Sequence, residues 1–347
     1  MTSQISSATD RAPLPIVVSG IQPSGQLHVG NYFGALRQNI DLANDASRRS
    51  EAFLFIVDYH ALTTLRDADA LRRYTMDAAL DYLALGFDPE GASLFVQSDV
   101  PQLGELTWIF LCLTPSSLLE KGVAYKDKVA QGLSANAGLL TYPILQAADI
   151  LAYADTSGDA RPDLLVPVGA DQKQNLEISR DTASRFNEAF SELFPLPEPM
   201  ILDAVATVPG LDGRKMSKSY GNTIGIFDEG TALKKKVMSI VTDSQPLEAP
   251  KDPDADNVFA LIRLFADDAT RDAVAEQYRA GGYGYGHAKK ELLGLIDGQF
   301  AEARERRREL AERPDRVREI LAAGAEAARA RAGETLARVR NAVGFLN

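Results

Sequence analysis

Short apolar runs alternate along the chain with segments whose apolar residues recur at helical spacing. Continuous runs of strand length are typical of strands buried on both faces of a parallel sheet. After the first run, Tyr32, Leu36 and Ile40 share one helical face, which indicates a helix starting near Val29. The expected strands are residues 16–18, 52–57, 93–96 and 163–168, and further helices are expected at 68–85 and 103–113. The alternation predicts a doubly wound parallel α/β sheet.

The alternation ends near a proline-rich bend at residues 194–199, where we place a domain boundary. Helical patterns dominate beyond it, and the fold class is α/β: a Rossmann-like doubly wound parallel sheet with a C-terminal helical domain. The expected parts are a disordered tail at 1–12, the Rossmann-like domain at 13–199, a junction loop at 200–225 and a helical region at 226–347. The pattern does not decide whether the last helices pack back on the sheet domain.

Length and composition describe a protein with a substantial core. The chain has 347 residues, of which 45% are hydrophobic. No apolar run approaches the roughly 18 residues of a membrane span, and residues 1–12 lack the apolar core of a signal peptide. The single Cys112 excludes disulfides within the chain and thiolate zinc sites. We therefore expect a soluble, cytoplasmic protein without membrane contact.

The charge distribution leaves two interpretations open for the C-terminal helices. A net charge of −11 argues against a general nucleic-acid binder, although a local basic face is compatible with it. Residues 301–347 carry 11 arginines against 8 acidic residues. These helices either form a solvated face of internal ion pairs or contact RNA.

The first candidate for chemistry is the glycine-rich turn at residues 19–32, which joins the first expected strand to the first expected helix. Gly20 and Gly25 allow tight backbone geometry, and the free N–H groups of a helix start attract anions. The segment ends in His28-Val29-Gly30-Asn31, which fits neither the dinucleotide-binding nor the P-loop pattern. Taken alone, the turn is either a structural connection or a phosphate cradle.

Polar residues also follow other strands at the carboxyl edge of the predicted sheet, where α/β proteins bind ligands. Asp58, Tyr59 and His60 follow one strand and residues 169–174 follow another, which predicts one cleft. The apolar segment 137–151 contains Tyr142, Gln146 and Asp149 on one helical face. Either Asp149 finds hydrogen-bond donors within the core, or these residues form the polar floor of a ligand pocket.

A second loop, residues 210–222, combines cations with hydroxyl groups. Arg214, Lys215 and Lys218 alternate with Ser217 and Ser219 between glycines. Ordinary surface loops are often basic, but this combination suits a polyphosphate whose charge grows as a bond breaks. We call this segment the lysine loop.

Together, His-Val-Gly-Asn at 28–31 and Lys-Met-Ser-Lys-Ser at 215–219 resemble the two signature motifs of class I aminoacyl-tRNA synthetases. Residues 19–25, 30–37, 139–143, 147–151, 166–174 and 241–244 are similar to the tryptophanyl-tRNA synthetases. Two departures are Tyr220-Gly-Asn directly after the Lys-Met-Ser-Lys-Ser motif, where Asp-Pro is common, and Gln146 in place of methionine. Tyrosyl-tRNA synthetases share the architecture and are the alternative family. A second alternative is a synthetase-like paralogue that binds tRNA or protein without aminoacylating.

The resemblance implies activation of L-tryptophan with ATP to tryptophanyl-adenylate, followed by transfer to tRNA(Trp). It also implies Mg²⁺ on the phosphates without a dedicated protein metal site, a homodimer, and anticodon binding by residues 226–347. The implied catalytic residues are His28, Lys215 and Lys218. The implied ATP-binding residues are Gln22, Pro23, Ser24, His28, Gly30, Asn31, Gly169, Ala170, Asp171, Val208, Lys215, Met216, Ser217, Lys218 and Ser219. The implied tryptophan-binding residues are Val57, His60, Tyr142, Gln146, Asp149, Val166, Val168 and Gln172, with Asp149 accepting the indole N–H and His60 near the substrate carboxylate.

Overall fold

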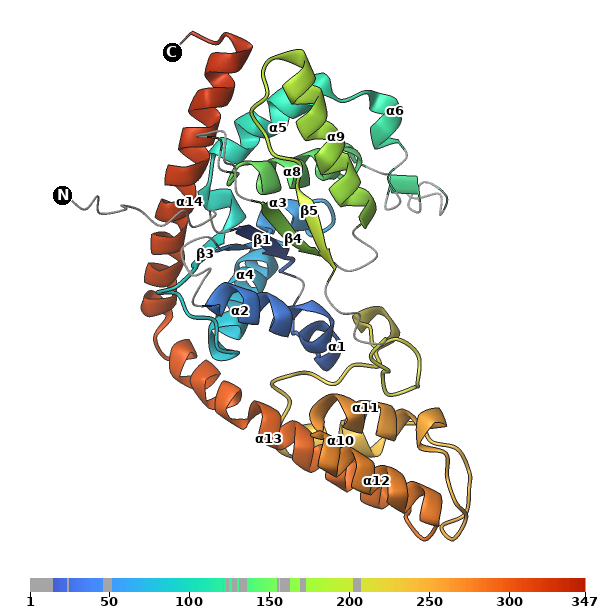
Figure 1. The fold of residues 1–347 in the computed structure, drawn as a ribbon. Helices are drawn as coiled ribbons and strands as arrows, with labels where there is room; N and C mark the ends of the chain where they lie inside the picture. The colour runs from blue at the N-terminus through green and yellow to red at the C-terminus, as the bar shows by residue number, and fades with distance from the viewer. Residues whose placement is uncertain are drawn as a thin grey trace, which may run out of the picture.

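The sheet of this computed structural model contains five parallel strands in the order β3-β2-β1-β4-β5 (Figure 1). The structure describes residues 15–346 except 24, 46–51, 121, 123–124, 127–129, 131–135, 155, 157–162, 169–172 and 202–206. The strands are β1 (Ile16–Ile21), β2 (Ala52–Ile56), β3 (Ser93–Val96), β4 (Leu164–Val168) and β5 (Glu198–Ile201). Because the strand order reverses at β1, the chain winds in both directions from the centre of the sheet. The predicted doubly wound fold is confirmed.

Helices cover both faces of the sheet, and two buried clusters lie beneath them. Val17, Leu54 and Leu94 face one cluster, whereas Ile16, Phe53 and Phe95 face the other, as the two-residue period of strands requires. Figure 1 shows α2 and α4 on one face and α5, α8 and α9 on the opposite face. The bounds of these first helices are α1 (Val29–Asn31), the π-helical turn η1 (Tyr32–Leu36), α2 (Arg37–Asn44), α3 (Asp58–Ala61), α4 (Ala68–Ala84), the 3₁₀ turn η3 (Gln97–Asp99), α5 (Gln102–Leu113), α6 (Ser116–Leu119), α8 (Ala137–Leu151) and α9 (Lys173–Ala189).

The sequence pattern missed one strand. The alternation was expected to end at the proline-rich bend, but β5 forms there and pairs with β4, with Pro199 opposite Val166. Proline cannot donate to a sheet ladder and is tolerated in an edge strand. β5 occupies such an edge, and it runs across the expected boundary at residue 199.

The last third of the chain is helical and returns to the sheet (Figure 1). Its elements, with the 3₁₀ turn η5 (Lys218–Tyr220) before them, are α10 (Gly230–Met238), the 3₁₀ turn η6 (Pro253–Ala255), α11 (Asn257–Phe265), α12 (Asp268–Ala280), α13 (Tyr285–Ala311) and α14 (Pro314–Val343). α13 packs on α10, α11 and α4, and α14 packs along β3. Gly324 of α14 allows this approach, because a Cβ there would lie 2.1 Å from the backbone oxygen of Leu94. The last helices therefore do pack back on the sheet domain.

Several arginines of these last helices form ion pairs within the chain. Arg307 binds Asp77 and Asp81 on α4 at 2.8 and 2.6 Å, and Arg340 pairs with Glu105 on α5. These contacts favour the ion-pair interpretation at these two arginines. Across the described residues, no helix has both the length and the apolar character needed to cross a membrane.

Candidate active site

The glycine-rich turn and the lysine loop lie against each other, although they are far apart in the sequence. The backbone N–H of Val29 donates to the carbonyl oxygen of Ile224 at 2.9 Å, and the N–H of Gly30 lies 3.3 Å from Met216 Sδ. Lys218 Nζ donates to the carbonyl oxygen of Gly25 at 3.1 Å. The two motif segments therefore form one surface around the start of α1.

Gly30 makes this contact possible. A Cβ at this position would lie 3.0 Å from His28 Nδ1 and 3.3 Å from Met216 Cβ, tighter than most Cβ contacts. The backbone N–H of His28 in turn donates to Asn31 Oδ1 at 3.1 Å, which stabilises the first turn of the helix. Gly30 thus allows the start of α1 to approach the lysine loop, and Asn31 stabilises the first turn of that helix.

His28 is almost fully buried beside a cation. Burial lowers the pKa of its imidazole to about 4, and the positive charge of Lys218 acts in the same direction. The imidazole is therefore neutral at pH 7. It is suited to hydrogen bonding with a nucleotide and does not add to the positive charge that the lysines supply.

The lysine loop is held in shape by its own hydrogen bonds. Asn222, which is buried, accepts from the N–H of Ser217 at 2.8 Å and donates to Asp212 Oδ1 at 2.6 Å and to the carbonyl of Lys215 at 3.1 Å. The N–H of Met216 donates to the carbonyl oxygen of Val208 at 2.9 Å. Both lysines of the motif are thereby carried on a defined backbone.

Arg214 and Tyr220 show how the departure after the motif is accommodated. The Arg214 guanidinium forms an ion pair with Asp212 at 2.6 Å and lies over the ring of Tyr220, 4.4 Å from its centroid. Arg214, one of the three cations in the lysine loop, therefore makes these two contacts within the loop itself. The tyrosine in place of the common aspartate supplies the ring on which it rests.

A cavity of about 490 Å³ opens beside this surface at the carboxyl edge of β1, β2 and β4. Gln22, which was predicted to bind ATP, lines this cavity. Six residues that were predicted to bind tryptophan line it as well: Val57, His60, Tyr142, Gln146, Asp149 and Val166. The remaining lining residues, which were not predicted at the ATP or the tryptophan site, are Val18, Gly20, Phe55, Thr63, Leu139, Ile150 and Asn175. Most of these are apolar strand or helix residues, and no local pattern distinguishes them from ordinary core.

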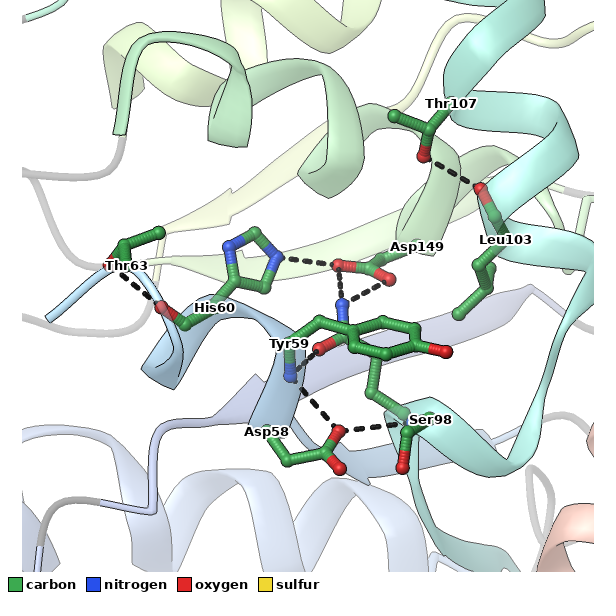
Figure 2. A network of polar contacts seen from close by, with 9 residues as sticks. Asp58, Tyr59, His60, Thr63, Ser98, Leu103, Thr107 and Asp149 are labelled. Carbon is green, nitrogen blue, oxygen red and sulfur yellow. Dashed lines mark hydrogen bonds and ion pairs between the residues drawn. The ribbon is translucent and has the colours of Figure 1, made fainter. Parts of the chain in front are cut away.

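Asp149 lies at the base of the cavity and is 1% exposed. His60 Nε2 lies 2.8 Å from its Oδ2 (Figure 2), and Gln97 Nε2 donates to Oδ1 and Oδ2 at 2.7 and 2.8 Å. Both interpretations drawn from the sequence are thus combined, because the carboxylate has donors in the core and also faces a pocket. His60, expected near a substrate carboxylate, is bound to Asp149 in this structure.

Gln97 is the functional candidate that sequence reasoning missed. It is fully buried and follows β3 directly, at the same edge of the sheet as Asp58 and His60. A polar residue at the carboxyl end of a predicted strand was the available signal. The strand before Gln97 was predicted. Its partner Asp149, however, lies 52 positions later in the chain, so the local sequence did not indicate that the two residues meet.

Some expected site residues cannot be placed. Ser24, Gly169, Ala170, Asp171 and Gln172 lie outside the described residues, as does the expected tail at 1–12. The side chain of Val168 is likewise not described. Among the described residues, no group of three or more His, Cys, Asp or Glu is arranged to hold a metal ion.

A doubly wound sheet whose first strand-to-helix turn meets a lysine loop beside a ligand pocket defines the class I aminoacyl-tRNA synthetases. The model of the family "tRNA synthetases class I (W and Y)" matches residues 12–298, and this chain belongs to that family.

Relatives and solved structures cover nearly the whole chain. The tryptophan–tRNA ligase of Rhodopirellula baltica is 52% identical over 329 residues, which are 95% of this chain and 99% of the relative. That of Fusobacterium nucleatum is 49% identical over 95% of this chain and 98% of its own length. The crystal structure of the Campylobacter jejuni tryptophanyl-tRNA synthetase, complexed with ADP and tryptophan, has a TM-score of 0.86 at 46% identity, with 95% and 99% of the two chains covered.

Proposed function

We propose that this chain is a tryptophan–tRNA ligase, which activates L-tryptophan with ATP and transfers it to tRNA(Trp). The observation that carries the proposal is the junction of the His28 turn and the lysine loop beside a pocket with a buried carboxylate, Asp149. The relatives of similar length and high identity support tryptophan as the amino acid.

In the first step, a carboxylate oxygen of tryptophan attacks the α-phosphorus of ATP. The bond to the β-phosphate oxygen breaks, and pyrophosphate leaves with the electron pair. No covalent enzyme intermediate forms, so the protein contributes positioning and charge stabilisation. Lys215 and Lys218 neutralise the departing pyrophosphate, while His28, Gly30 and Asn31 hold the nucleotide at the start of α1. In the second step, a hydroxyl of the terminal tRNA ribose attacks the acyl carbon and AMP leaves.

The cavity takes the amino acid. Asp149 accepts a hydrogen bond from the indole N–H, Val57 and Val166 flank the ring, and Tyr142 and Gln146 bind the amino group. A site built around a hydrogen bond rejects an analogue that lacks it by roughly 10⁴–10⁵. Such a pocket needs no separate editing domain. Gln172 also binds the amino group.

Three further assignments belong to the same proposal. Mg²⁺ enters bound to the phosphates of ATP, as part of the substrate. Residues 226–347 form the anticodon-binding region and residues 200–225 the junction with the catalytic domain at 13–199. The active form is a cytoplasmic homodimer, and sedimentation of the purified protein tests its oligomeric state.

ATP–pyrophosphate exchange, measured separately with tryptophan and with tyrosine, tests the proposed function. Exchange with tryptophan alone is expected. Exchange with tyrosine alone would assign the chain to the other branch of the family. The absence of exchange with both amino acids would favour a paralogue that binds tRNA or protein without aminoacylating.

A further inference from the structure

Gln97 has a defined orientation inside the protein. Its amide nitrogen bridges both oxygens of the Asp149 carboxylate at 2.7 and 2.8 Å, while its amide oxygen accepts from the N–H of Tyr59 at 3.1 Å. The reverse orientation would set the amide oxygen against a carboxylate and the amide N–H groups against another N–H. Its neighbours therefore allow a single orientation.

The backbone around Gln97 is tied on two sides. Asp58 Oδ1 accepts from the N–H of Tyr59 and the N–H of Ser98, both at 3.0 Å, which joins the start of α3 to η3 (Figure 2). On the outer side, Arg329 of α14 donates to the carbonyl oxygen of Asp99 at 2.9 Å. The glutamine thus projects from a segment that is fixed to both the sheet domain and the C-terminal helix.

Among the described residues, the hydrogen bonds of Asp149 leave one acceptor position of its carboxylate open. A carboxylate oxygen accepts about two hydrogen bonds. Oδ2 has two partners among the described residues, Gln97 and His60, whereas Oδ1 has only Gln97. Because Asp149 lines the cavity, the second position of Oδ1 suits a donor on a bound ligand.

We infer that Gln97 is a positioning residue for substrate selection, which orients the Asp149 carboxylate so that Oδ1 receives the indole N–H. This inference rests on the proposed function. Gln97 lies behind the carboxylate and does not line the cavity, so it acts through Asp149. Its three contacts stabilise the buried charge and hold the carboxylate in one rotamer, which reduces the reorganisation needed when the indole binds.

The variant Gln97→Met removes the amide while keeping a similar volume. The kcat/KM for tryptophan in ATP–pyrophosphate exchange is expected to fall about 10- to 100-fold, as for the loss of a hydrogen bond to a charged group. For 3-benzothienyl-alanine, in which sulfur replaces the indole N–H, the change is expected to be under about threefold. The preference for tryptophan over this analogue therefore falls. An equal fall for both substrates, or an unchanged preference, would overturn the inference.

Gln102→Met is the matched control, because it also removes a glutamine amide close to η3. The Gln102 amide donates to the carbonyl oxygen of Arg329 at 3.4 Å, and the hydrogen bonds of the described residues include none between Gln102 and Asp149. The preference of the Gln102→Met variant for tryptophan over the analogue should equal that of the wild type.

If the wild-type protein exchanges only with tyrosine or with neither amino acid, the proposed function and this inference both fail. If wild type uses tryptophan and Gln97→Met retains the preference, only this inference fails.

Gln97→Glu supplies a second test that also serves if Gln97→Met does not fold. The new carboxyl donates to Asp149 only when protonated, and the neighbouring carboxylate raises the pKa of the introduced group. The kcat/KM for tryptophan, expressed relative to wild type at each pH, should therefore rise as the pH falls from 8 to 6. A ratio that does not change with pH would contradict the positioning role.

Discussion

At the scale of single residues, burial decides which side chains carry charge at the site. His28 is 7% exposed, and burial with the adjacent Lys218 keeps it neutral near pH 7. Asp81 is similarly buried, and burial raises the pKa of its carboxyl to about 6 although Arg307 opposes the shift. Positive charge where the two motif segments meet therefore depends on the lysines more than on the histidine.

The depressed pKa of His28 predicts a loss of stability in acid. A histidine with a pKa of about 4 in the folded state and 6.5 in the unfolded state binds more protons when unfolded between those values. Stability from this group is therefore present above pH 6.5 and is lost as the pH falls toward 4. Between pH 7 and pH 5, wild type should lose about 2 kcal/mol more than His28→Asn in urea unfolding. His28→Gln should behave as His28→Asn does, and a gap that is the same at both pH values would contradict the shift.

At the scale of elements, the lysine loop depends on one asparagine. Asn222 joins both ends of the loop through three side-chain hydrogen bonds, and its backbone oxygen accepts from the N–H of Leu211 at 2.9 Å. Gly210 packs so closely against it that a Cβ there would lie 2.3 Å from the Asn222 amide nitrogen. The shape that presents the two lysines is thus set outside the five-residue motif.

Asn222→Ala is expected to lower kcat for adenylate formation about 10- to 100-fold while the KM for tryptophan changes little. The reason is that misplaced lysines lose contact with the departing pyrophosphate, whereas the cavity is untouched. Single-turnover formation of the adenylate measures this, with Lys218→Ala as the reference for loss of one cation.

Asn187→Ala is the matched control for Asn222→Ala. Asn187 on α9 makes three hydrogen bonds to the backbone of Leu193 and Phe194, far along the chain from the lysine loop. This variant should lose stability while keeping kcat. A loss of kcat in both variants, or a raised KM alone in Asn222→Ala, would argue against the role of Asn222.

At the scale of the whole molecule, α14 closes one edge of the sheet. Its residues Leu321 and Ala325 belong to the two different core clusters, so the helix joins both layers across β3. An exposed edge strand is a template for aggregation, and a covering helix removes it. Because β3 leads directly into Gln97, the same packing also supports the floor of the cavity.

Gly324→Ala should destabilise the protein by about 1–3 kcal/mol, because an added methyl group would meet the backbone of Leu94. Gly333→Ala on the same helix is the control: its nearest contact would be 3.8 Å away, and alanine favours helix by up to about 1 kcal/mol. The midpoint temperature of thermal unfolding should therefore fall for Gly324→Ala and rise for Gly333→Ala. Equal shifts would show that α14 does not press on β3.

Local sequence predicted the architecture well because its signals act over short distances. Four of the five strands were predicted, since each of β1 to β4 contains a short apolar run. β5 was missed because it has only four residues, and Glu198 and Pro199 at its start leave no apolar run of strand length. The helix with Tyr142, Gln146 and Asp149 was likewise predicted from spacing, and the cavity does line up these three side chains.

The sequence by itself determined the two motif segments, the alternation of β1 to β4 with helices, and the polar residues that follow the strands at the carboxyl edge of the sheet. Only the tertiary structure decided which donors meet Asp149, how Asn222 shapes the lysine loop and where α14 lies. These contacts join residues from separate elements, such as Gln97 and Asp149, and their geometry depends on how those elements pack. Periodicity reports which face of an element is buried, but it carries no information about the partner across the interface.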